Sequence, residues 1–340
     1  MRPSIRLSFA ATALIAAGPA VAQAAPGYAV SGSIAVTADG GWDYTSVDPA
    51  TGHVYVARAD SVTIADPVAG TARAVGATAK SHAVVPIPDL GLLLVTSGRD
   101  DSVRLIDAAS GTEKARIAAG NDPDAAFYDA AGHRAVVMNA KGGTVSVIDV
   151  AAAKVVRTIT LKPGLEFGVL GPNGTLFVNN EDANEIETAN LDTGAVGVAI
   201  ALTGCTGPTG LAFDAKTHRL ISACANGKAA VVDTVAGRLT GLLAIGAGPD
   251  AVILDAGRRL AFIPCGKDGV LDAIALDAKG GPAVVATIRT EPGARTGAVD
   301  PRSGVIYLPT ARFAAPVAPA TKAAAVPGSF HILVVSPSIK

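Results

Sequence analysis

A turn followed by a short apolar strand recurs seven times along this chain at nearly constant spacing. Each copy has an Asp or Gly, a few small or polar residues, and then β-branched or aliphatic residues, as in DPATGHVYV at Asp48 and DPRSGVIYL at Asp300. These two copies are 252 residues apart over six intervals, which gives a mean period of 42 residues. The copies begin at Asp48, Asp89, Asp129, Gly171, Asp214, Asp255 and Asp300. The sequence therefore predicts a repeat protein.

A second marker keeps the same period. A strand ends at Asp66, Asp107, Asp149, Asp192, Asp233 and Asp277, and the seventh copy, ILVVSP, has Ser336 at this place. In the third repeat the pattern predicts four strands, at about 124–128, 134–139, 144–149 and 154–159. Four short strands in a period near 42 are typical of a β-propeller blade. We predict an all-β fold, a seven-bladed β-propeller with four-stranded blades.

The two ends of the chain share one blade in this prediction. The last repeat supplies only three strands, and an unassigned strand at about 28–36 fills the fourth place. Pairing of this N-terminal strand with the C-terminal blade closes the ring and covers strand edges that would otherwise be exposed. A pair of β-sandwiches and an open solenoid are the alternatives, but seven copies with one split across the termini favour closure.

The first residues have the pattern of a secretory signal peptide. Arg2 and Arg6 precede a small apolar run, and Ala22-Gln23-Ala24 matches an A-x-A cleavage site, so we predict a signal peptide over 1–24. Pro19 interrupts the stretch, which argues against a membrane span, and no later run is long enough. We expect a periplasmic or secreted protein whose residues 25–340 form a single propeller domain. Removing both arginines changes the formal net charge from -1 to -3.

Several motifs resemble those of the YVTN-repeat β-propellers, the YncE-like group of exported bacterial proteins. The resemblance lies in VSVIDVAAAKVVRTI followed by GNDPDAAFYDAAGHRAVVMN, and in PTGLAFD, GPDA and the closing PGSFHILVV. The YVTN motif itself is degenerate, appearing as YVAR, LVTS, VVMN and FVNN. The similarity extends over essentially the whole mature chain. It implies a seven-bladed propeller and export, without implying a settled activity.

Blade geometry predicts a polar funnel at one face of the ring. The first strand of each blade begins at the face that also carries the loop between the second and third strands, so polar residues at both places converge. The predicted ligand-binding residues are Trp42, Asp43, Tyr44, His82, Arg99, Asp124, Glu166, Glu181, Asp250 and Arg295. A water-filled polar channel and a ligand site both fit this pattern.

Carboxylates around one axis raise one another's pKa or attract a cation. A divalent cation such as Ca²⁺ is the only cofactor that the pattern suggests, and Asp43, Asp124, Glu166 and Asp250 would hold it if they lie at one level. Of the five histidines, His82 alone is predicted at the funnel. The sequence contains no His/Cys cluster with zinc spacing.

Trp42 is the single tryptophan and allows two interpretations. With Tyr44 and Phe167 it would form an apolar wall suited to a sugar or a flat ligand. Alternatively it plugs the channel by packing, which we favour because isolated aromatic residues more often pack than recognise ligands.

The three cysteines fit an oxidising compartment. Cys205 precedes an inner strand and Cys224 ends the next one, so their ends of the hairpin meet and we predict a disulfide between them. Cys265 lies one period after Cys224 and is predicted to be a buried, inert thiol. The Ala/Pro-rich segment 311–328 is either a lid or a disordered insertion, and its composition favours disorder.

The sequence favours a binding protein or scaffold without catalysis. No nucleophile elbow, phosphate loop, H-E-x-x-H or haem motif is present. The expected partner is a small molecule or another periplasmic protein, and we expect a monomer. The alternative is a metal-dependent hydrolase of the sugar-lactonase type that uses the four carboxylates, with His82 near the substrate. A mature charge of -3 without a basic cluster argues against nucleic-acid binding.

Overall fold

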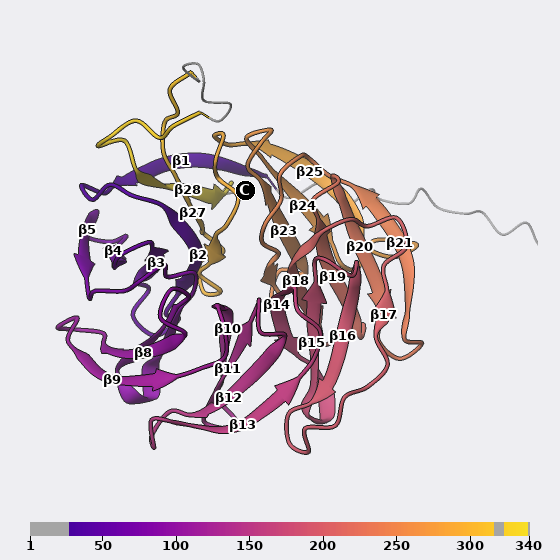
Figure 1. Cartoon of the computed structure of the whole chain (residues 1–340). Helices are drawn as coiled ribbons and strands as arrows, with labels where there is room; N and C mark the ends of the chain where they lie inside the picture. Colours follow the sequence, from indigo (N-terminus) through magenta and orange to yellow (C-terminus); the bar gives the residue numbers. More distant parts are fainter. Residues whose placement is uncertain (1–26, 316–322, 339–340) are drawn as a thin grey trace, which may run out of the picture.

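The computed structural model describes residues 27–315 and 323–338, and these residues form a ring of seven sheets (Figure 1). Each sheet has four antiparallel strands, and in six of them the strands follow one another in chain order from the axis outward. Two short 3-10 turns, η1 (Pro88–Leu90) and η2 (Pro172–Gly174), join strands. The predicted seven-bladed propeller with four-stranded blades is confirmed.

The strand bounds follow the predicted period. Blades 1 to 3 consist of β2 (Trp42–Val47), β3 (Val54–Arg58), β4 (Val62–Asp66) and β5 (Thr71–Val75); β6 (Val84–Ile87), β7 (Leu92–Ser97), β8 (Ser102–Asp107) and β9 (Glu113–Ala118); and β10 (Pro123–Asp129), β11 (Arg134–Asn139), β12 (Thr144–Asp149) and β13 (Lys154–Thr160). Blades 4 to 6 consist of β14 (Leu165–Leu170), β15 (Thr175–Asn180), β16 (Glu185–Asn190) and β17 (Ile200–Ala201); β18 (Pro208–Asp214), β19 (Arg219–Cys224), β20 (Lys228–Asp233) and β21 (Arg238–Ala244); and β22 (Ile253–Asp255), β23 (Leu260–Cys265), β24 (Val270–Ala275) and β25 (Ala283–Arg289).

Blade 7 joins the two ends of the chain. It consists of β26 (Ala298–Val299), β27 (Ile306–Thr310), β28 (His331–Pro337) and β1 (Tyr28–Ala35). The outer strand β1 pairs antiparallel with β28, from Tyr28 opposite Pro337 to Ala35 opposite His331. The predicted closure of the ring is therefore confirmed. The predicted signal peptide over 1–24 lies outside the described residues, within which no helix is long and apolar enough to cross a membrane.

The repeated aspartates terminate strands because their side chains accept backbone N–H groups of the following turn. Asp48 accepts from the amide of Ala50 at 2.8 Å, and Asp66 accepts from that of Val68 at 2.9 Å. In blade 4 this role belongs to Asn190, which accepts from the amides of residues 192 and 193. The predicted marker Asp192 instead accepts a hydrogen bond from Arg134 at 2.7 Å.

Apolar residues of the middle strands fill the space between neighbouring blades. All five residues of β3 and all six of β23 are buried. At the face of the Asp turns, ion pairs also connect blades 5 and 6. Arg259 donates to both carboxylate oxygens of Asp214, at 2.7 and 2.6 Å, and also to Asp277. Asp214 is 2% exposed, so this guanidinium compensates a buried charge.

The cysteine prediction is confirmed. Cys205 and Cys224 form a disulfide with their Cα atoms 5.4 Å apart, and Cys265 is a buried free thiol. The expectation of disorder for 311–328 is wrong for the described flanks of this insertion. Phe313 and Ala325 form an antiparallel bridge, and the amide of Val326 donates to Arg312 O at 2.8 Å. Residues 316–322 lie outside the described part of the chain.

Candidate functional site

One position of the repeat gathers polar side chains at the axis. This position comes directly after the first-strand residue that pairs with the last residue of the second strand. Asp43 follows Trp42, which pairs with Arg58, and Asp124 follows Pro123, which pairs with Asn139. Equivalent positions of successive inner strands surround the axis, so their side chains approach one another whatever their separation in sequence. We call this set the axial ring: Asp43, His82, Asp124, Glu166, Thr209, Asp250 and Arg295.

Irregular strand pairing positions the axial ring. In blades 1, 3, 4 and 5 the register of the inner strand shifts between its first paired residue and the third residue after it. Asp43, Asp124 and Glu166 each lie inside such a shift. A bulge re-aims side chains that regular pairing would direct at the neighbouring blades. The carboxylates of blades 1, 3 and 4 thus lie where the pairing of the inner strand is irregular.

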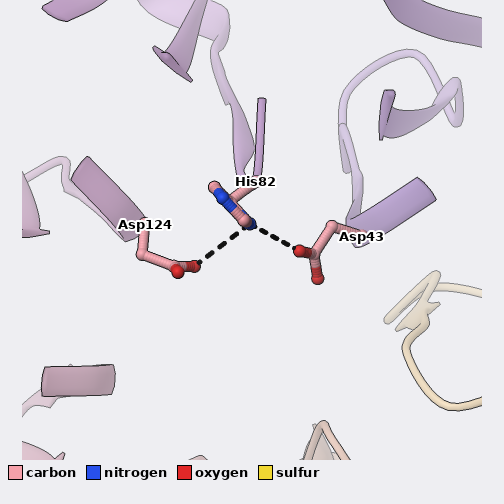
Figure 2. Close-up of side chains that lie close together, drawn as sticks. All are labelled: Asp43, His82 and Asp124. Atoms are coloured by element: carbon pink, nitrogen blue, oxygen red, sulfur yellow. Dashed lines mark hydrogen bonds and ion pairs between the residues drawn. The ribbon is translucent and has the colours of Figure 1, made fainter. Parts of the chain in front are cut away.

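Three axial residues from neighbouring blades are in direct contact (Figure 2). His82 Nδ1 lies 2.7 Å from Asp43 Oδ2 and 3.7 Å from Asp124 Oδ1. The three ligand atoms lie within 4.8 Å of one another, and the side chains are 17 to 19% exposed. His82 Nε2 is buried without a hydrogen-bond partner among the described residues. One nitrogen and two carboxylate oxygens at this spacing are a donor set that suits a divalent metal ion.

Glu166 and Asp250 have different partners. The hydroxyl of Tyr44 donates to Glu166 Oε2 at 3.2 Å, and Arg295 Nε lies 3.0 Å from Asp250 Oδ2. The four carboxylates predicted as metal ligands therefore do not form one close group. Asp43 and Asp124 come together around His82, whereas Glu166 and Asp250 are held by their own neighbours.

The carboxyl groups of the axial ring resist ionisation. Burial, together with the charge of nearby carboxylates, raises the pKa of Asp124 to about 7 and that of Glu166 to about 9. Burial also raises the pKa of Asp250 to about 7, although Arg295 opposes this. Burial lowers the pKa of His82, but the hydrogen bond to Asp43 and the charge of Asp124 outweigh this and raise it overall. Only when more than two of its four carboxyl groups are ionised does the ring carry more negative charge than His82 and Arg295 neutralise.

Two aromatic rings fill the axis beside the axial ring. The next position of the repeat is Tyr44 in blade 1 and Phe167 in blade 4, and their ring centroids are 5.3 Å apart. In the other blades this position is small: Ala83, Ala125, Gly210, Ala251 and Thr296. These small residues leave room for Tyr44 to reach across to Glu166. The plug of the axis is therefore Tyr44 with Phe167.

Trp42 is not part of this plug. Its ring packs 5.1 Å from that of Phe330 and 6.2 Å from that of Phe313, in the cluster that joins blade 1 to the last blade. Neither the predicted wall of Trp42 with Tyr44 and Phe167 nor the predicted Trp42 plug describes this packing.

The residues predicted on the loops at the funnel differ in whether they interact with the axial ring. Glu181 is exposed, and its charge raises the pKa values of Glu166 and Asp250, so it faces the axial ring. Arg99 is exposed on the turn between β7 and β8, and among the described residues it forms no hydrogen bond or ion pair with the ring. Asp122, two residues before Asp124 of the axial ring, binds Lys80 at 3.0 Å and Lys141 at 2.9 Å.

The sequence analysis missed Thr209 of the axial ring. Its side chain is uncharged, so its place in the period was the only signal for it.

Comparisons with known proteins agree with this architecture. The solved structure of Kuenenia stuttgartiensis hydrazine synthase matches 80% of this chain and 94% of its own, with a TM-score of 0.70. The two sequences are 16% identical over the match, so the similarity concerns the fold alone. No curated protein matches the sequence significantly.

A family model also matches the sequence. The model of the YncE-like β-propellers matches residues 63–238, slightly more than half of the chain. The match extends from blade 1 to blade 5 and includes four residues of the axial ring: His82, Asp124, Glu166 and Thr209. Together with the seven blades, this match shows that the chain belongs to the YncE-like β-propeller family.

Proposed function

We propose that the protein is an exported, non-catalytic binding propeller that takes a small cation at its axial ring. The observation that carries the proposal is the placement of four carboxylates at equivalent positions around the axis in four blades, with Arg295 as the one permanent cation among them. A bound cation would replace the repulsion among these groups by attraction.

The accessibility of the ring supports this proposal. Asp43, Asp124 and Asp250 are about one-fifth exposed, so a ligand from solvent has access to oxygens that are already largely desolvated. A cation gains more from a partly desolvated carboxylate than from one on the open surface. The same chemistry accepts a divalent metal ion or an organic ammonium group, and an experiment distinguishes the two.

Export is the second part of the proposal. The predicted signal peptide, the disulfide between Cys205 and Cys224, and membership of the YncE-like family all support it. We expect the protein recovered from outside the cytoplasm to begin at Ala25, which mass spectrometry of the intact chain measures. An N-terminus that retains 1–24 would contradict export by this route.

The test of binding uses thermal unfolding of the chelator-treated, disulfide-intact protein at pH 7.5. CaCl₂, MnCl₂ and putrescine are the separate probes, and a probe present at 100 times its Kd stabilises the protein by about 2.7 kcal/mol. We expect at least one probe to raise the Tm of the wild type but not that of Asp43→Asn. Asp60→Asn is the control, because Asp60 is exposed in a surface turn. If no probe distinguishes wild type from Asp43→Asn, the proposal is wrong.

A metal-dependent hydrolase of the sugar-lactonase type is the second candidate. The contact among Asp43, His82 and Asp124 favours it, because a metal ion held there would activate water next to a histidine. The test compares hydrolysis of glucono-δ-lactone by chelator-treated and Mn²⁺-supplemented protein above the buffer rate. Metal-dependent hydrolysis that His82→Gln abolishes would favour this candidate over the binding propeller.

A further inference from the structure

A cavity of about 590 Å³ opens beside the aromatic plug, among the turns that join the first and second strands. Inner strands of blades 1 to 3 form its walls, and Phe167 contributes from blade 4. We call it the turn-side pocket and define it by Tyr44, Val85, Asp89, Ala126, Phe127 and Phe167. Its volume lies within the range of about 300 to 1,000 Å³ that is typical of small-molecule sites.

The turn-side pocket is separate from the axial ring. Tyr44 lines the pocket, and its hydroxyl donates to Glu166 of the axial ring. Tyr44 is 7% exposed and packs against Phe167, so the two rings form a wall between the ring of carboxylates and the pocket. A ligand in the pocket therefore contacts aromatic carbon where a ligand at the axial ring contacts carboxylates.

The lining of the pocket selects for a particular chemistry. Most of its surface is carbon from alanine, valine, proline and aromatic side chains, and neither Lys nor Arg lines it. Its single carboxylate is Asp89, on the 3-10 turn η1 at the rim. Asp89 accepts a hydrogen bond from Tyr128 at 2.9 Å and lies 3.5 Å from His133 Nδ1.

This combination favours an aromatic cation. A flat ring packs favourably against Tyr44 and Phe167, and a positive charge near aromatic faces and a carboxylate is attracted by both. The side chain of Asp89 is 42% exposed, so its charge reaches a group at the mouth of the pocket. An aromatic anion meets the same carbon walls but is repelled by Asp89, with no lysine or arginine in the lining to compensate.

We propose that the turn-side pocket is a second binding site, distinct from the axial ring, for a small aromatic amine whose ring packs on Tyr44 and Phe167 and whose ammonium group pairs with Asp89. The site does not depend on a cation at the axial ring. A ligand of the turn-side pocket needs an aromatic ring, whereas a cation at the axial ring does not.

The test is a calorimetric titration with 2-naphthylmethylamine, and with 2-naphthoate as the matched anion. We expect the amine to bind the wild type, the anion to bind at least about fivefold more weakly, and Asp89→Asn to reduce amine affinity about fivefold. Asparagine keeps the acceptor for Tyr128, so this variant removes charge without removing the hydrogen bond. Ala130→Trp places a large ring at the exposed edge of the pocket and should abolish binding.

Variants of the axial ring complete the test. Asp43→Asn should bind 2-naphthylmethylamine as the wild type does, and Asp60→Asn is the surface control. If Asp43→Asn loses amine binding while Asp89→Asn retains it, the amine binds at the axial ring. This outcome overturns the turn-side site but supports the proposed function. Absence of binding at millimolar amine, or equal affinity for the anion, would also overturn it.

Discussion

Glu166→Gln should stabilise the protein at neutral and alkaline pH, although it removes a polar contact of the axial ring. The pKa of Glu166 is raised by burial, and by Asp124, Glu181 and Asp250, from an ordinary value of 4.5 to about 9. At pH 7.5 the folded protein therefore holds a proton that the unfolded chain has released. Glutamine keeps the shape of this neutral form, and its carbonyl oxygen accepts from the Tyr44 hydroxyl as Oε2 does.

The magnitude follows from linkage between protonation and folding. About three pH units lie between the ordinary pKa of Glu166 and pH 7.5, and at about 1.4 kcal/mol per unit they correspond to about 4 kcal/mol. Part of this cost is repulsion that the neighbouring carboxyl groups share, so we expect a single replacement to recover about half of it, about 2 kcal/mol. This is about 4 °C in Tm for a chain of this size.

The pH dependence separates this explanation from simple packing. Because the pKa of Glu166 is higher in the folded state, its stabilising contribution is complete below about pH 4.5 and is lost as the pH rises toward about 9. Urea unfolding of wild type and Glu166→Gln at pH 7.5 and pH 4.0 measures this, with Asp60→Asn as the control. The expected gain falls from about 2 kcal/mol to under about 0.5 kcal/mol at pH 4.0. An equal gain at both pH values, or a loss at pH 7.5, would refute the reasoning.

Three further predictions concern the scaffold. Cys205→Ser should lower the free energy of unfolding by about 3 kcal/mol, because the disulfide closes a loop with a sequence separation of 19, whereas reducing agent should leave that variant unchanged. Arg259→Met should lower it by about 3 kcal/mol in urea unfolding, because the largely buried carboxylate of Asp214 loses its partner, and an unchanged midpoint would contradict that role. Removal of β1 should expose the edge of β28 and cause aggregation measurable by light scattering, while a monomeric, cooperatively folding product would disprove closure by β1.

The repeat made the fold and part of the site predictable. A period of 42 residues identifies the first strand of each blade, and blade topology alone then brings Asp43, His82 and Asp124 to one axis. The disulfide was predictable for the same reason, since both cysteines lie at defined places of one hairpin. These inferences needed only the order of the strands, and the repeated turn and strand motifs in the sequence are enough to predict that order.

Contacts that depend on side-chain direction were not predictable. The two residues of the plug, Tyr44 and Phe167, lie in different blades, on inner strands that contain bulges. The turn residues in the sequence do not predict these bulges. The pattern of small residues at the other equivalent positions was present in the sequence as a signal for this packing. The packing of Trp42 was not predictable for a related reason. Its partner Phe313 lies within the insertion 311–328, which is outside the period, and its partner Phe330 lies just after that insertion.

The repeat uses carboxylates in two opposed ways, and this contrast argues for function at the axial ring. At the turn face, backbone N–H groups and arginines hold the pKa of Asp66, Asp214 and Asp300 below the ordinary value, so their ionisation stabilises the fold. At the axial ring, burial and mutual repulsion raise the pKa of Asp124 and Glu166, so their ionisation destabilises it. Folding explains the first set completely. The second set lowers stability at neutral pH, in a position where blade 5 has the uncharged Thr209, and a cation that offsets the repulsion accounts for carboxylates there.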